Sequence, residues 1–383
     1  MFVFRRRGRR GVAAGFALLI VAGTAVLLLG TGIASSAGSQ GPVVKAAPLP
    51  TSVPSGVTVG AARQTPAEVQ AYWTPQRMAA AKPLDMSMSR TSARAPVAAP
   101  TKGALGTAPA YMPSSLKPIG PARNPSQGLG PTAGGSPDTQ CYQCFIPYTR
   151  WYYFPRYRTF PVSTVGKLFF TIGGSGFVCS ASTNYVDTVM TAGHCVYTPG
   201  TGFNGNFLFC PSYNAGINPA VGCWGANYEV TSTVWANTGS FEWDTGAINT
   251  LPTGTLINNH IGNVTGWLGL LWNGSDDYNW VDFGYPQAAP FDGNYIVVCN
   301  SEFGYEETDG NNQGGHNSLA IGCDMTGGSS GGPFILAFAS GNYLNGHNDW
   351  RYNALPQAMN TPYYTTIECQ VDVAAGRSDI ASC

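Results

Sequence analysis

Short apolar runs separated by turn-forming residues dominate the chain after residue 140. Runs such as Leu168–Phe170, Thr188–Met190 and Tyr295–Val298 are β-branched or aromatic and are bounded by Gly, Asn and Pro. Short runs of this composition are typical of β-strands, and no long stretch has the helical period. The pattern predicts an all-β barrel or sandwich, and about 240 residues are enough to bury a core.

Residues 38–140 differ in composition. They are rich in Ala, Pro, Gly and Ser and have few large apolar side chains. Such a stretch buries too little apolar surface to offset the entropy lost on ordering, so we expect a largely disordered pro-segment or linker. One short helix is the exception. Thr65 is a capping residue, Pro66 suits the first helical position, and Glu68 completes a capping box. This helix should end near Tyr72–Pro75, because a proline biases the preceding residue away from helix.

The first residues have the pattern of an export signal. Five arginines lie within the first ten residues, Val12–Leu29 is apolar, and Ser35–Ala37 offers the small side chains that signal peptidase needs. We therefore predict a signal peptide over residues 1–37 and a secreted, extracellular protein. Because the apolar stretch is long, an uncleaved membrane anchor is the alternative.

Charge is distributed unevenly along the chain, although the formal net charge is zero. From residue 140 onward there are 6 Lys or Arg against 17 Asp or Glu, whereas residues 38–139 carry 9 basic and 3 acidic residues. The acidic C-terminal part argues against a nucleic-acid partner. The basic pro-segment should bind the acidic part as an internal partner, partly through charge.

All ten cysteines follow residue 140. An even number of cysteines in an exported protein indicates disulfides rather than metal ligands. Cys141 and Cys144 favour a structural disulfide, with the partners left open. Sequential pairing would close three short loops, by joining Cys210 to Cys223, Cys299 to Cys323, and Cys369 to Cys383.

Three motifs in the order His, Asp, Ser carry the candidate chemistry. They are Thr191–Cys195, Trp243–Ile248 and the glycine-rich Gly327–Pro333. Each motif is weak alone, since glycine-rich serine turns are common and a histidine beside a cysteine is usually structural. A cysteine fifteen residues before the histidine, and another directly after it, make the combination specific.

The three polar residues His194, Asp244 and Ser330 have complementary chemistry. A serine hydroxyl is a poor nucleophile until an imidazole removes its proton, and the imidazole needs a buried carboxylate to fix its tautomer. Glycines near the serine let the backbone turn tightly and direct N–H groups at a developing oxyanion. The N–H groups of Gly328 and Ser330 are the candidates for this oxyanion hole.

With these motifs, the chain resembles the chymotrypsin/trypsin superfamily of serine peptidases, in particular the secreted bacterial trypsin-like type, over about residues 160–365. The resemblance implies two six-stranded antiparallel β-barrels with the catalytic triad between them, in a peptidase domain spanning residues 141–383. It also implies a disulfide between Cys179 and Cys195 beside the histidine.

Two departures from the family pattern concern activation and the triad. Trypsin and chymotrypsin place an aspartate before the nucleophile, where this chain has Ser329. The family's salt bridge to a new N-terminus is therefore not expected, and other contacts must hold the oxyanion hole. Asp349 stands where the family has a serine that supports the catalytic aspartate. Asp349 and Trp350 lie on the expected substrate-pairing strand.

Asp324 is the candidate specificity residue. It lies six residues before Ser330, where trypsin-like enzymes place the carboxylate at the base of the specificity pocket. The resemblance thus implies cleavage after Arg or Lys, with an apolar or aromatic preference as the alternative. Lys167 is the only lysine after residue 140, and such scarcity would protect the enzyme from its own activity.

These observations predict a secreted serine endopeptidase that hydrolyses protein or peptide substrates through an acyl-enzyme intermediate. We expect a monomer that needs no cofactor and no metal. An esterase with the same triad is one alternative, because the triad does not choose amide over ester. A non-catalytic homologue that acts as a binding protein is the other. The remaining histidines, His260, His316 and His347, are expected to be solvated or structural.

Overall fold

The computed structural model describes residues 48–89, 100–119, 146–152, 156–307, 311 and 313–383. The predicted signal peptide and the pair Cys141 and Cys144 lie outside the described residues. Within the described ranges, no helix is long and apolar enough to cross a membrane. Strands dominate these ranges, as the sequence pattern predicts.

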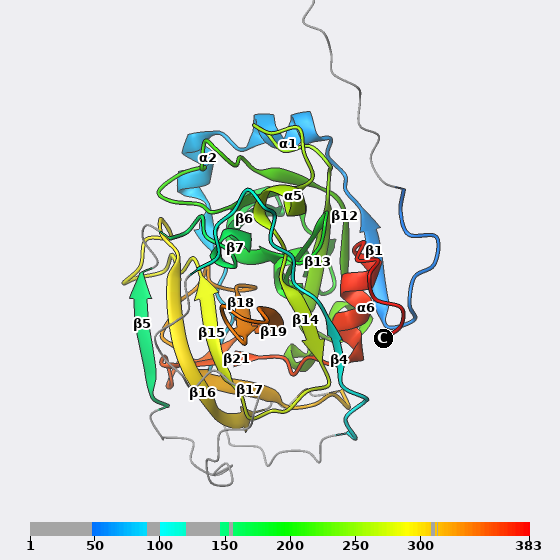
Figure 1. The fold of residues 1–383 in the computed structure, drawn as a ribbon, viewed down its shortest axis with the longest axis vertical. Coiled ribbons are helices and arrows are strands. Elements are labelled where there is room, and N and C mark those ends of the chain that lie inside the picture. The colour runs from blue at the N-terminus through cyan, green and yellow to red at the C-terminus, as the bar shows by residue number, and fades with distance from the viewer. Residues whose placement is uncertain (1–47, 90–99, 120–145, 153–155, 308–310, 312) are drawn as a thin grey trace, which may run out of the picture. The chain divides into compact units, whose positions relative to one another are not determined.

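Six antiparallel strands close into a first barrel (Figure 1). Their bounds are β6 Val165–Ile172, β7 Ser175–Thr183, β8 Thr188–Ala192, β11 Gly205–Pro211, β12 Trp224–Ser232 and β13 Thr245–Thr250. The order is β12-β11-β6-β7-β8-β13, and pairing between β12 and β13 closes the ring. Phe170 and Phe207 stack inside it with their ring centroids 5.9 Å apart, which adds an aromatic pair to the apolar core.

A second sheet carries the other half of the fold. Its central strands, in spatial order, are β21 Ala358–Thr361, β17 Ser318–Gly322, β16 Val297–Glu307, β15 Asn279–Gly284, β18 Pro333–Leu336 and β19 Tyr343–His347. Two flanking strands, β14 Gly269–Trp272 and β5 Tyr148–Tyr152, pair with β19 and β16. The predicted fold class is confirmed. The apolar runs at 168–170 and 188–190 lie in β6 and β8, and the run at 295–298 overlaps the start of β16.

Short elements connect the strands. They are η1 Val162–Thr164, α3 Gly193–Val196, β9 Tyr197–Thr198, β10 Gly202–Phe203, α4 Thr233–Thr238, η2 Phe241–Trp243, α5 Ile261–Thr265 and β20 Arg351–Tyr352. The longest described helix is α6, Thr366–Ala374, near the C-terminus. The all-β prediction does not include α6, although Thr365 and Glu368 form a capping box at its start.

The disulfides follow the predicted pairing. Cys179 is bonded to Cys195, as the family resemblance implies. The three sequential pairs, Cys210–Cys223, Cys299–Cys323 and Cys369–Cys383, are also present. Each sulfur bridge ties a loop back to its own sheet or helix, which restricts the unfolded chain.

The segment before the barrels is more ordered than its composition predicts. Its elements are β1 Val57–Ala61, α1 Pro66–Tyr72, α2 Pro75–Ala80, β2 Lys82–Pro83, β3 Ser87–Met88 and β4 Gly106–Ala108. Figure 1 shows β1 alongside β12 and β4 alongside β14, in agreement with their pairing. The expectation of disorder is therefore wrong for residues 48–89 and 100–119. Strand pairing uses backbone groups, so it needs few apolar side chains.

The helix predicted from the capping box is confirmed as α1. The side chain of Thr65 accepts from the N–H of Glu68, and the Glu68 carboxylate accepts from the N–H of Thr65. Just beyond the helix, Trp73 is buried, and its Nε1 donates to the carbonyl of Asn206 over 2.6 Å. Val69 and Met78 are buried beside it. A few large side chains thus fix this segment on the first barrel.

Glu229 on β12 gives the fold a testable dependence on pH. Burial raises the pKa of its carboxyl from 4.5 to about 8, with Arg63 acting against the shift. A raised folded-state pKa means that the folded protein binds the proton more tightly than the unfolded chain. Stability from this group is therefore complete below about pH 4.5 and is lost as the pH rises toward 8.

We expect Glu229→Gln to match the parent near pH 4.5 and to melt at a higher temperature than the parent above pH 8. The measurement is the Tm between pH 4 and 9, with both proteins carrying Ser330→Ala to prevent self-digestion. A difference in Tm that does not change with pH would contradict the assignment.

Candidate active site

His194 and Asp244 are brought together by two neighbouring strands of the first barrel. His194 lies on α3, directly after β8, and Asp244 immediately precedes β13. Ala192 and Thr245 are paired across these strands. The residues just beyond the two strand ends therefore face each other.

Two hydrogen bonds fix the imidazole against the carboxylate. Nδ1 of His194 lies 2.7 Å from Oδ2 of Asp244, and the N–H of His194 donates to Oδ1 over 2.6 Å. A side chain at position 193 would disturb this contact, because a Cβ on Gly193 would lie 2.6 Å from Oδ1. An ionised carboxylate only accepts hydrogen bonds, so Nδ1 carries the proton and Nε2 is left as the acceptor.

Asp349 adds a second carboxylate to this site. Its Oδ1 lies 3.5 Å from Nδ1 of His194, farther than the Asp244 oxygen. The expected closeness of Asp349 to the triad is therefore observed. At 3.5 Å an N–H···O contact is at the outer limit of hydrogen bonding, so Asp244 is the stronger partner.

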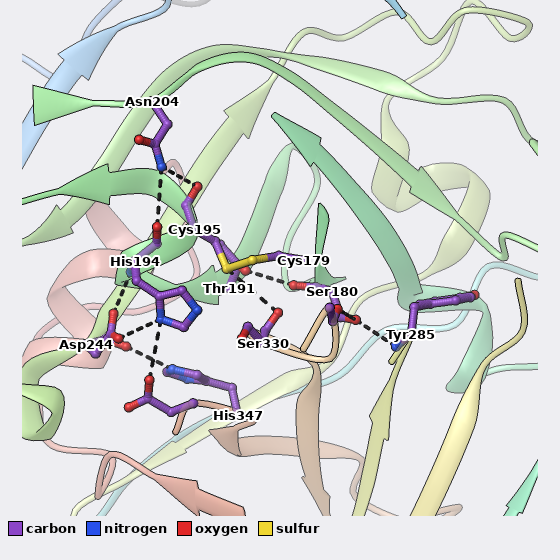
Figure 2. The surroundings of a disulfide bond; sticks show 12 residues. Cys179, Ser180, Thr191, His194, Cys195, Asn204, Asp244, Tyr285, Ser330 and His347 are labelled. Carbon is purple, nitrogen blue, oxygen red and sulfur yellow. Dashed lines mark hydrogen bonds and ion pairs between the residues drawn. A yellow bond between two sulfur atoms is a disulfide. The ribbon is translucent and has the colours of Figure 1, made fainter. Parts of the chain in front are cut away.

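Ser330 lies in the tight turn between β17 and β18. The turn depends on Gly328 and Gly331, whose φ angles are +98° and +78°. Residues that have a side chain rarely adopt these backbone angles. A Cβ on Gly331 would also lie 2.0 Å from Oγ1 of Thr191. Figure 2 shows the His194 ring between Asp244 and Ser330, with the Cys179–Cys195 disulfide alongside.

Nε2, the acceptor nitrogen of the His194 imidazole, is free to take part in a reaction. Nε2 of His194 is buried and has no hydrogen-bond partner among the described residues. The adjacent Ser329 is directed elsewhere, since a Cβ on Gly284 would lie 2.8 Å from the Ser329 Cβ. A buried acceptor without a partner costs free energy in the folded protein, and it leaves Nε2 available to take a proton.

The N–H of Gly328 is directed by contacts on the other side of its peptide bond. The carbonyl of Gly327 accepts hydrogen bonds from the N–H groups of Gln287 and Ala288, over 2.8 and 3.1 Å. In a trans peptide the N–H points away from the preceding carbonyl. The two contacts therefore fix the direction of one candidate oxyanion donor.

Ser180, which lies outside the three sequence motifs, holds the rest of this turn. Its hydroxyl donates to the carbonyl of Gly328 over 2.9 Å and accepts from the N–H of Tyr285 over 2.8 Å. Its N–H donates to the carbonyl of Ser330 over 2.7 Å. These are contacts of the kind that we expected to replace the family's aspartate, which is Ser329 here.

His347 is structural, as predicted, but it lies in the core rather than in a solvated loop. Its Nε2–H donates to the backbone carbonyl of Asp244 over 2.9 Å, and its Nδ1 lies 3.0 Å from the hydroxyl of Tyr364. Burial lowers the pKa of His347 to about 4. The ring is therefore neutral at neutral pH and supports the backbone of Asp244 without adding charge.

Two candidate substrate-binding residues, Trp350 and Asp324, differ in their burial and in their contacts. Trp350 is fully buried and stacks on Phe241, with ring centroids 5.6 Å apart. Asp324 forms an ion pair with Arg150 of β5, and their side chains are 25% and 36% exposed. The carboxylate proposed for the base of the specificity pocket is thus already paired with a cation of the same chain.

Three described clusters have metal-ligating side chains within reach of one another. Two of them include cysteines that are joined in disulfides, which have no thiolate to offer. The third consists of His194, Asp244 and Asp349, the group described above. None of the three therefore indicates a metal site separate from the candidate catalytic residues.

The chain is similar to two proteases of known structure. No protein-family model and no curated protein matches it. The protease Anisep from Arthrobacter nicotinovorans is 34% identical, with a TM-score of 0.51, over 56% of this chain and 96% of Anisep. The thermostable serine protease AL20 from an extremophilic microorganism is 32% identical, with a TM-score of 0.51, over 56% of this chain and 98% of AL20.

Proposed function

Because the chain belongs to the chymotrypsin/trypsin superfamily of serine peptidases, we propose that it is a secreted endopeptidase with His194, Asp244 and Ser330 as its triad. The observation that carries the proposal is the buried Nε2 of His194. It has no hydrogen-bond partner among the described residues, while Nδ1 is held by Asp244.

The proposed mechanism assigns one task to each residue. Nε2 of His194 takes the proton of the Ser330 hydroxyl as the oxygen attacks the substrate carbonyl carbon. Asp244 keeps the imidazole in the required tautomer and stabilises the imidazolium that forms. His194 then gives the proton to the leaving amine, and an acyl-enzyme on Ser330 remains for water to hydrolyse.

The negative charge that develops on the substrate oxygen needs preorganised donors. The N–H groups of Gly328 and Ser330 are the proposed pair. Support comes from the hydrogen bonds that fix the carbonyl preceding each N–H. The Gly327 carbonyl accepts from Gln287 and Ala288, and the Ser329 carbonyl accepts from the N–H of Gly332 over 2.9 Å. Donors that do not have to reorganise contribute most of the stabilisation in such sites.

The proposed function also includes a division of the chain into segments and a location outside the cell. We propose a signal peptide over 1–37, a pro-segment over 38–140 and a monomeric peptidase domain over 141–383. Ordered contacts of β1 and β4 with the barrels support a pro-segment rather than a plain linker. Disulfides within the described barrels agree with an extracellular location.

A peptide-library digest tests the endopeptidase assignment against both alternatives. We expect internal peptide bonds to be cut, and cutting to stop after treatment with a fluorophosphonate. Hydrolysis of esters without cleavage of peptides would indicate an esterase. No reaction with the fluorophosphonate and no hydrolysis, in the full-length chain and in cleaved protein alike, would indicate a binding protein.

Substrate preference is proposed separately from the chemistry. We propose that Asp324 favours Arg or Lys in the specificity pocket, as a charge-assisted pair with the substrate. The pairing of Asp324 with Arg150 makes a direct comparison possible. Asp324→Ser should reduce the preference for Arg over Phe by about tenfold or more, whereas Arg150→Ser should increase it by freeing the carboxylate.

The measurement is kcat/KM on matched peptides with Arg, Phe or Glu before the scissile bond. The Glu peptide serves as the control for a general effect of charge. A preference for Arg that is unchanged in Asp324→Ser would place the carboxylate outside the pocket.

A further inference from the structure

Residues Lys82–Met88, here called the crossing segment, run from the first barrel to β20. At one end, β2 pairs in parallel with β7, and the N–H of Leu84 donates to the carbonyl of Val178 over 3.1 Å. At the other end, β3 pairs in parallel with β20 at Arg351, in a small sheet of two strands. The crossing segment is therefore held by backbone hydrogen bonds at both of its ends.

One backbone atom of this segment occupies a proposed catalytic contact. The carbonyl oxygen of Leu84 accepts the N–H of Gly328 over 2.9 Å. Among the described residues, the N–H of Ser330 makes no backbone hydrogen bond to that oxygen. The Leu84 carbonyl thus takes one of the two proposed oxyanion donors without engaging both, so a substrate carbonyl cannot use the hole while the segment is in place.

Side chains of the crossing segment also cover the chain around Trp350 and Arg351, next to the expected substrate-binding residues. Oδ2 of Asp85 accepts from Nη2 of Arg351 over 3.1 Å, and Nη1 of the same arginine lies 3.4 Å from the carbonyl of Met325. Met86 and Met88 pack on the aromatic cluster that contains Trp350. These contacts use surface that a bound peptide would need.

Buried residues just before the crossing segment hold it in position. Trp73, Met78 and Ala81 are buried against the first barrel. The carbonyl of Ala81 accepts from Nε2 of Gln287 over 2.7 Å. Because these anchors already order the chain, little further conformational entropy is lost when the segment binds across the cleft.

We propose that the crossing segment is an internal inhibitor, which blocks the oxyanion hole through Leu84 and is locked by the ion pair between Asp85 and Arg351. The proposal rests on the proposed peptidase function. In the uncleaved chain the catalytic turn is already assembled by Ser180, and access to it is what is missing. Activation then consists of displacing the segment rather than of building the oxyanion hole.

Fluorophosphonate labelling of the full-length chain tests this inhibitor. The readout is the labelling rate of the full-length band on a gel, which excludes self-processed molecules. Asp85→Arg should raise that rate by about tenfold or more, because it sets two like charges against each other at Arg351. Asp85→Asn, which preserves the side-chain shape, should raise the rate by less.

Gln76→Arg is the matched control. It adds the same cation at an exposed position of α2, outside the crossing segment and away from Arg351, and should change the rate by no more than about twofold. Near-UV circular dichroism of each variant establishes that it is folded, and Asp85→Asn provides the test if Asp85→Arg does not fold.

The outcomes separate the two proposals. A parent chain that is labelled as fast as both Asp85 variants would overturn the inhibitor and leave the peptidase function standing. Absence of labelling in every form, including self-processed or externally cleaved protein, would instead overturn the proposed function. An equal rise in Gln76→Arg and Asp85→Arg would also overturn the lock at Arg351.

Discussion

Replacement of Ser330 by alanine is expected to lower the rate of peptide hydrolysis by about 10⁶-fold, because members of a triad act as a unit. His194→Ala should cost about as much. The fold should survive Ser330→Ala, since the change removes only one oxygen, and the turn is held by backbone contacts of the neighbouring residues. The measurement is kcat/KM on a peptide substrate, with the Tm as the test of folding.

Ser329→Ala is the matched control for that loss. The two serines are adjacent, but the Ser329 side chain packs against Gly284. Most of the activity should therefore remain in Ser329→Ala. If Ser330→Ala kept substantial activity and Ser329→Ala did not, the choice between the two serines would be wrong.

Asp244→Asn is expected to lower kcat by about 10⁴-fold. An amide NH₂ facing Nδ1 would donate rather than accept, so the imidazole would move its proton to Nε2 and lose the acceptor that Ser330 needs. Asp349→Asn should have a much smaller effect, because its oxygen lies 3.5 Å from Nδ1 whereas that of Asp244 lies 2.7 Å away.

The pair of aspartate variants therefore decides which carboxylate serves the histidine. Both are close enough to be candidates, and both variants keep the shape of the side chain. The readout is kcat for each variant, measured at several pH values to separate a loss of catalysis from a shift in protonation. A larger loss in Asp349→Asn than in Asp244→Asn would reverse the assignment.

The sequence predicted the parts of the fold that depend on local pattern. The strands follow from short apolar runs bounded by turn-forming residues, and the helix after Thr65 follows from a capping box. The same capping signal at Thr365 and Glu368 begins α6, in a region that the apolar runs predict to be wholly β. That helix was predictable from the chain.

The order of residues 48–89 was not predictable from composition. A composition argument averages over the segment, whereas its stability comes from a few buried side chains such as Val69 and Trp73. The rest comes from edge pairing, as between β1 and β12, which involves backbone groups common to every residue. Neither contribution changes the average hydrophobicity of the segment by much.

In the candidate site, too, local features were predictable from the sequence and long-range contacts were not. Local motifs identified His194, Asp244 and Ser330, but the contacts that surround them join distant parts of the chain. Ser180 contacts Gly328 across 148 positions in the sequence, and the Asp85–Arg351 pair spans 266. Such contacts depend on how the sheets fold together, and one sequence contains no local signal for them.

The central claim is that Ser330 is a nucleophile activated by His194, and it is tested most directly by mapping the fluorophosphonate adduct by mass spectrometry. We predict a single modified residue, Ser330, in the active protein, and no modification in His194→Ala under the same conditions. Modification of Ser329, or equal labelling of Ser330 in His194→Ala, would contradict the account.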